Sequence, residues 1–320
     1  MRGLDRLLRL VGAALLTIFV AITINFVIFR AAPGDAVSNI SAIPRASAQE
    51  KLALRHEFGL DKSLGEQYLL YLKQLAHGNL GESFSSRESV SHVLVRAIGN
   101  TIPMVLLGTA IAIALGVALG VFAAYRHGSA GDHVGVGAAL ALYALPTQWV
   151  GLMLIVLFAG VLPTGGMQDE FLIEPGFWSH AQDVARHMVL PALTLGVGLL
   201  GQFALITRSS MLDVMGEDYV LTARAKGLGR RRALTRHALR NATLPLVNLI
   251  ALSLGTIVAG AVLVETVFSW PGIGRVVYTA VSTRDYPVLQ GAFLVLTVSV
   301  ICCNLIADLV VLRLDPRVRA

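Results

Sequence analysis

The sequence predicts an all-α polytopic membrane protein with six transmembrane helices. Of its 320 residues, 55% are hydrophobic and only 14% are charged, and the mean hydropathy is +0.69. Because a soluble domain carries about 25% charged residues, this composition indicates a chain that lies largely in a bilayer. Six apolar runs are also about as long as a membrane-spanning helix requires. They cover residues 10–29, 102–125, 134–161, 189–206, 244–264 and 289–312.

The first apolar run is predicted to be an uncleaved membrane anchor. Arg2, Arg6 and Arg9 precede it, as basic residues precede the core of a secretory signal. However, its apolar core is longer than the roughly 15 residues of a signal peptide. Pro33 also stands close to where cleavage would be needed. We therefore expect the first run to stay in the membrane.

The basic residues predict the orientation of the chain. With an even number of spans both termini share one side, and the segments on that side carry a large excess of Lys and Arg. The loops on the other side are close to neutral or acidic. The positive-inside rule therefore places both termini in the cytoplasm. The predicted layout is a cytoplasmic N-terminus with the first helix (1–30), an extracytoplasmic cap segment (31–96), a five-helix core (97–312) and a cytoplasmic tail (313–320).

The densest positive charge lies in the polar segment 216–245, between the fourth and fifth apolar runs. Glu217 and Asp218 stand at its start, where the N-terminus of a helix favours negative charge. A first helix is predicted to begin there. Gly227 and Gly229 are predicted to separate it from a second, basic helix over 231–241. A basic helix pair outside the bilayer is a surface that another protein can bind.

Two runs in this segment resemble the coupling segment of the dipeptide, oligopeptide and nickel family of ABC-importer permeases, of the first-permease or B type. They are DYVLTARAKGL at 218–228 and RHALRNATLP at 236–245. The wider importer class has E-A-A-x-x-x-G here; when the chain is aligned on Gly227, Leu221 replaces the Glu and Thr222 replaces the first Ala. Further blocks with this resemblance are FRAAPGD (29–35), NTIP (100–103), LPTQW (145–149), LPTGG (162–166), HMVLPALTL (187–195), VETVFSWPGIG (264–274) and LDPRVR (314–319).

The resemblance implies a type I ABC importer permease core with a cytoplasmic coupling helix within residues 208–243. It also implies import of di- or oligopeptides through a bacterial inner membrane, by alternating access. The implied partners are a paralogous permease subunit, two ABC ATPase subunits that bind ATP and Mg, and an extracytoplasmic substrate-binding protein. This chain itself would bind no cofactor. The implied ATPase-coupling residues are Asp218, Tyr219, Thr222, Ala223, Arg224, Ala225, Lys226 and Gly227.

Other functions remain as alternatives at this point. Relatives in the resembling family carry nickel chelates or other small solutes, so a different cargo stays open. A secondary transporter driven by an ion gradient is disfavoured, because Asp308 is the only carboxylate well inside a predicted span. The sequence contains no G-x-x-x-x-G-K-[ST] and no G-x-S-x-G, and HEFGL at 56–60 lacks the second His of a zinc-protease motif. We therefore predict no catalytic and no metal-binding residues.

Four residues are candidates for the pore or its gate. Gln148 and Gln202 are polar residues inside predicted spans, where a polar side chain is costly unless it lines a path or finds a partner. Glu265 and Trp270 mark the outer end of the fifth span. Trp270 is open to two interpretations. It is either an interfacial aromatic or, as the resemblance implies, part of a loop that gates the pore from outside.

Overall fold

A computed structural model describes residues 2–31, 62–169, 176–227 and 261–314, together with residues 229, 239, 245–247, 249 and 250. Its helices are α1 (Arg2–Ala31), α3 (Leu64–Ala76), α4 (Val90–Tyr125), α5 (Ala130–Ala144), α6 (Thr147–Phe158), α7 (Phe177–Met215), α8 (Asp218–Ala225), α11 (Ile273–Thr283) and α12 (Tyr286–Leu314). Residues 261–267 are also helical. Most of the fifth predicted span and of the cap segment, the second basic helix and the tail after Leu314 lie outside the described residues.

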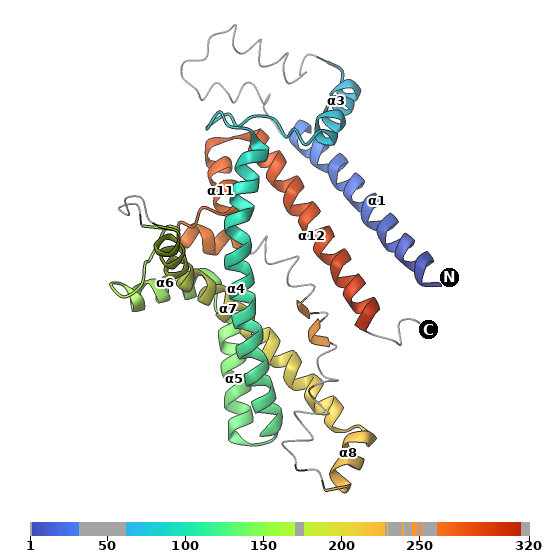
Figure 1. The fold of residues 1–320 in the computed structure, drawn as a ribbon, viewed down its shortest axis with the longest axis vertical. Coiled ribbons are helices and arrows are strands. Elements are labelled where there is room, and N and C mark those ends of the chain that lie inside the picture. The colour runs from blue at the N-terminus through green and yellow to red at the C-terminus, as the bar shows by residue number, and fades with distance from the viewer. Residues whose placement is uncertain are drawn as a thin grey trace.

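Four of the described helices are long and apolar enough to cross a membrane, and they match four of the predicted spans. They are α1, α4, α7 and α12, and the pair α5 and α6 adds a fifth candidate. In Figure 1, α1 and α12 lie side by side, and α3 and α8 occupy opposite ends of the molecule. The all-helical class is therefore confirmed. Six spans in total stay a prediction, because the fifth run is mostly outside the described residues.

The third predicted span is not one continuous helix. The axes of α5 and α6 are bent by 100° at the break between them. Leu145 and Pro146 at the break have extended backbones, with ψ near 130°. Proline has no N–H to donate and disfavours a helical conformation in the residue before it, so the bend follows from the Leu-Pro dipeptide. The pair forms either a broken span or a re-entrant loop.

Close contact between α4 and α7 forms the centre of the described fold. A Cβ built on Gly116 would lie 2.6 Å from the Cβ of Phe203, and one on Gly120 would lie 2.6 Å from the Cβ of Thr207. Both glycines are buried. The G-x-x-x-G spacing of this pair thus allows the backbones of α4 and α7 to pack closely.

Asn25 on α1 connects this helix to both α3 and α12. Ser63 and Glu66 form a capping box at the start of α3, which fixes where the helix begins. The buried side-chain amide of Asn25 on α1 donates hydrogen bonds to the hydroxyl of Tyr71 on α3, at 3.3 Å, and to the backbone carbonyl of Gln290 on α12, at 3.1 Å. A polar side chain inside the first span is thus used to hold three helices together.

Candidate functional sites: the α7–α8 corner and the Glu265 junction

The predicted coupling helix is present as α8, directly after α7. The long helix α7 ends at Gly216, whose backbone N–H donates to the carbonyl of Asp213. After a short turn α8 runs over eight residues, and Gly227 follows with φ +85°, a conformation that glycine adopts without strain. Val220 is the one residue of α8 that is buried among those whose side chains are described. The other α8 residues with described side chains are exposed, so Val220 is the contact by which this part of the helix packs on the rest of the molecule.

The predicted coupling residues fall on an accessible surface. Those with described side chains are exposed: Asp218, Tyr219, Thr222, Ala225, Lys226 and Gly227. The backbones of Ala223 and Arg224 lie in α8, and their side chains are outside the described residues. In Figure 1, α8 lies at the extreme end of the molecule, beyond the turn that joins α4 to α5. This position suits a contact with another chain.

A partly buried ion pair holds α7 to the start of α5. The guanidinium of Arg208 donates two hydrogen bonds to Asp132, with Nε 2.6 Å from Oδ1 and Nη2 2.8 Å from Oδ2. The backbone N–H of Gly128 donates to Oδ2 at 3.0 Å, and the Nδ1 of His127 lies 3.1 Å from the same oxygen. The Asp132 side chain is 3% exposed. This Asp132–Arg208 pair lies about two helical turns before α7 ends, close to α8.

The sequence analysis did not identify this pair. Asp132 and Arg208 are 76 positions apart. Each lies just outside the end of a predicted span, where charged residues are common. The one available signal was the opposite charge of two residues predicted to lie on the same side of the membrane.

The second site is organised by Glu265, which is fully buried. Its Oε1 accepts a hydrogen bond from the hydroxyl of Thr101 on α4, at 2.6 Å. Its Oε2 accepts from the backbone N–H groups of Gly274 and Arg275, at 2.7 and 3.2 Å. The carboxylate thus caps the N-terminus of α11, where negative charge is favourable. The Thr101 hydroxyl also accepts from the N–H of Ile273 at 2.9 Å.

We call this group of Glu265, Thr101 and the backbone of 273–275 the Glu265 junction. It joins the N-terminal part of α4 to two segments about 170 positions further along the chain, the helix at 261–267 and the start of α11. Gly272 is required beside it, because a Cβ there would overlap the Glu265 carboxylate. The predicted gate residue Glu265 therefore hydrogen-bonds to α4 through one oxygen and to the start of α11 through the other.

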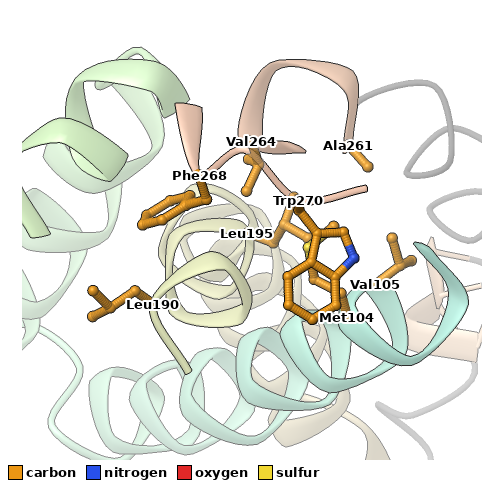
Figure 2. Close-up of a cluster of buried hydrophobic side chains, with 8 residues drawn as sticks. All are labelled: Met104, Val105, Leu190, Leu195, Ala261, Val264, Phe268 and Trp270. Atoms are coloured by element: carbon orange, nitrogen blue, oxygen red, sulfur yellow. The ribbon is translucent and has the colours of Figure 1, made fainter. Parts of the chain in front are cut away.

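Trp270 is also buried, so the interpretation as an interfacial aromatic is wrong. Its side chain is 0% exposed, and its Nε1 donates to the backbone carbonyl of Asn100 at 2.9 Å. The side-chain amide of Asn100 donates in turn to the carbonyl of Pro271 at 2.9 Å. Figure 2 shows the indole in an apolar cluster beside Met104 and Val105. The amino-acid sequence alone could not reveal that Trp270 is buried, because its burial depends on how the 268–272 turn folds back onto α4.

The other two pore candidates are not part of this junction. Gln148 lies in the first turn of α6 and Gln202 lies in α7, and both are half-buried. Neither makes a hydrogen bond with Glu265 or Trp270 within the described ranges. Their role in a pore stays a prediction.

These features define a polytopic membrane protein in which the long helix α7 leads from the region near the Glu265 junction to the short helix α8 at the opposite end of the molecule. Comparison with known proteins identifies the family. Residues 116–320 match the model of the binding-protein-dependent transport system inner membrane component, and residues 4–105 match the N-terminal model of the same membrane components. The chain therefore belongs to this family of inner membrane permeases, and it is a transport subunit rather than an ATPase.

Relatives with curated names cover almost the whole chain. The dipeptide transport system permease protein DppB of Escherichia coli strain K12 is 40% identical over 99% of both chains. The di/tripeptide transport system permease protein DppB of Pseudomonas aeruginosa is 42% identical over 97% of both chains. A putative peptide permease protein of Brucella ovis is 39% identical over 92% of both chains.

Proposed function

We propose that this chain is one pore-forming subunit of an ATP-driven importer of di- or oligopeptides. The observation that carries the proposal is the similarity to named peptide permeases along essentially the full length of both chains. The cargo is proposed on that similarity. The proposed assembly contains a paralogous permease subunit, two ATPase subunits that bind ATP and Mg, and an extracytoplasmic binding protein. Both termini and α8 face the cytoplasm, in accordance with the distribution of basic residues.

In this proposal α8 transmits the movement of the ATPase subunits to the pore. The 39 residues of α7 span about 58 Å as a helix, and the helix ends at the turn into α8. The Asp132–Arg208 pair fastens this end of α7 to the start of α5. A force on α8 would therefore move α4, α5 and α7 together. Coupling requires that the ATPase bind one state of the pore better than the other.

The Glu265 junction is proposed to hold the outer gate. It fixes the 268–272 turn and α11 to the outer part of α4 through buried hydrogen bonds. If α4 moves as part of a rigid unit with α7, the turn that carries Trp270 moves with it. Movement at the cytoplasmic end can thus change access at the outer end, as alternating access requires.

Cross-linking tests the proposed coupling contact. In a variant with Cys302 and Cys303 replaced by alanine, Ala225→Cys on α8 should form a cross-link to a lysine of an ATPase subunit with a short reagent that joins a thiol to an amine. The yield should change when ATP is added. Ser282→Cys, exposed on α11, is the matched control and should give no such cross-link. No cross-link from Ala225→Cys, or a cross-link from Ser282→Cys, would contradict the proposed contact or orientation.

Uptake tests the proposed cargo. Proteoliposomes that contain the complete complex and enclose ATP should accumulate labelled dialanine only when the binding protein is present outside. Uptake that needs an ion gradient but no ATPase subunit would instead support a secondary transporter.

A further inference from the structure

An open cavity of about 780 Å³ lies at the end of α7 opposite α8. Its walls come from the loop that follows α6, the N-terminal part of α7 and the turn that leads into α11. From His187 in its wall to the end of α7 the helix extends about 42 Å. The volume is in the range of sites that hold small organic ligands. We call it the outer cavity.

The outer cavity presents both signs of charge. Asp169 and Asp183 line it together with Arg186 and Arg275. Asp183 is fixed in place, because it accepts the backbone N–H of Asp169 at 2.7 Å and lies 3.3 Å from the Nδ1 of His187. A cavity lined by carboxylates, one of them fixed, and by guanidinium groups is complementary to a ligand that carries both a cation and an anion.

Arg275 is the most distinctive group in the wall. Its backbone N–H is held by Glu265, so its Cα position is fixed. Its side chain is half-buried, and its guanidinium makes no hydrogen bond or ion pair with any residue in the described part of the chain. The two oxygens of Glu265 are already occupied by Thr101 and by backbone N–H groups. A half-buried cation without a protein partner is costly unless an anion or water satisfies it.

Arg275 also lines a second cavity of about 390 Å³, together with Asn100, Thr279 and Asp285. The same residue therefore contributes to the walls of both cavities. A ligand that passed from one to the other would stay within reach of this cation.

We propose that the outer cavity binds the two charged ends of a short peptide, with Arg275 receiving the C-terminal carboxylate and the Asp169–Asp183 side receiving the N-terminal ammonium. This inference rests on the proposed peptide cargo and assigns a specific binding site to it. A guanidinium binds a carboxylate through paired, charge-assisted hydrogen bonds, which gives orientation as well as affinity. Selection would then occur in the permease itself, after the binding protein has released the peptide.

Thiol protection tests the site without transport. In the background that lacks Cys302 and Cys303, Ser269→Cys places a thiol in the wall of the outer cavity. In the complete complex, without the binding protein, saturating dialanine should slow modification of this thiol about fivefold, whereas dialanine amide should not. Arg275→Gln should abolish the protection. Ser282→Cys, outside the cavity, should show no protection by either compound.

Uptake supplies the second measurement. Arg275→Gln should lower dialanine uptake about tenfold while ATP hydrolysis stimulated by the loaded binding protein stays unchanged. The matched control Arg284→Gln removes an exposed arginine at the other end of α11 and should leave uptake unchanged. Retained ATP hydrolysis shows that the variant is folded and assembled.

The results separate the two proposals. Equal protection by dialanine and its amide, or no effect of Arg275→Gln on protection, would overturn the assignment of the site even if the wild type imports dialanine. Protection by the binding protein alone would also overturn it, because the cavity would then be a docking surface. A wild-type complex that fails to import dialanine would refute the proposed cargo, whatever the thiol experiment shows.

Discussion

Replacing Glu265 by alanine should strongly destabilise the protein, because three donors lose their acceptor. The hydroxyl of Thr101 and the backbone N–H groups of Gly274 and Arg275 all donate to this carboxylate. The Glu265 side chain is 0% exposed, so water cannot readily replace it. Each buried donor left without a partner costs about 1–3 kcal/mol. Allowing for partial relaxation, we expect a loss of about 4 kcal/mol in the free energy of unfolding for Glu265→Ala.

Glu265→Gln should cost far less, and the difference tests the geometry. The amide oxygen of glutamine can accept the two backbone N–H groups at the start of α11. Its NH₂ group would then face Thr101, whose hydroxyl can turn to donate to the carbonyl of Ala97, 3.1 Å away. All polar groups stay satisfied, so we expect a loss of about 1 kcal/mol, from the charge-assisted part of the hydrogen bonds.

The assay is denaturant unfolding of the purified permease in detergent micelles, followed by tryptophan fluorescence, since Trp270 reports on the same turn. Glu88→Ala is the control, because the Glu88–Arg96 pair is exposed and 3.5 Å long; it should cost only a few tenths of a kcal/mol. The reasoning is refuted if Glu265→Ala is as stable as the control, or if glutamine and alanine are equally destabilising.

Three further predictions concern helix packing and coupling. Gly116→Leu should destabilise the fold by about 2 kcal/mol or more, measured by the same unfolding assay, because the α4–α7 contact has no space for a side chain; Gly137→Leu, where a Cβ meets nothing within 4 Å, should be neutral. Asp132→Ala should lower peptide uptake per ATP hydrolysed, because α7 is no longer held to the start of α5; an unchanged ratio would contradict this role. Val220→Ser should reduce binding-protein-stimulated ATP hydrolysis while thermal stability changes little, since only the attachment of α8 is weakened; unchanged hydrolysis would count against a mechanical role for α8.

The α8 segment illustrates what the sequence could predict. The acidic residue Asp218 at the start and Gly227 after the end delimit a helix by local rules, and the structure places α8 between them. These signals act within one or two turns of the chain. The apolar runs similarly predicted α1, α4, α7 and α12, since a bilayer selects helices by length and hydropathy alone.

The Leu145-Pro146 break and Trp270 show where local signals fall short. Pro146 is a local helix-breaking residue, yet the apolar run 134–161 predicted one continuous span, and the 100° bend is accompanied by packing of α6 against α7. Trp270 has a sequence context suited to a membrane interface, yet the turn buries it against α4. In each case the deciding contact comes from residues far away in the sequence.

The amino-acid sequence by itself determined the helical class, most of the described spans, the short helix α8 and the family, because hydropathy, charge and local helix signals are properties of contiguous residues. Only the tertiary structure decided the partners of Glu265, the Asp132–Arg208 pair and the place of Arg275 in the walls of two cavities. The Asp132–Arg208 pair joins residues 76 positions apart, and the Thr101–Glu265 hydrogen bond joins residues 164 positions apart. Hydrogen bonds of this kind depend on distances of about 3 Å between side chains and backbone groups, and such distances exist only after the helices have packed.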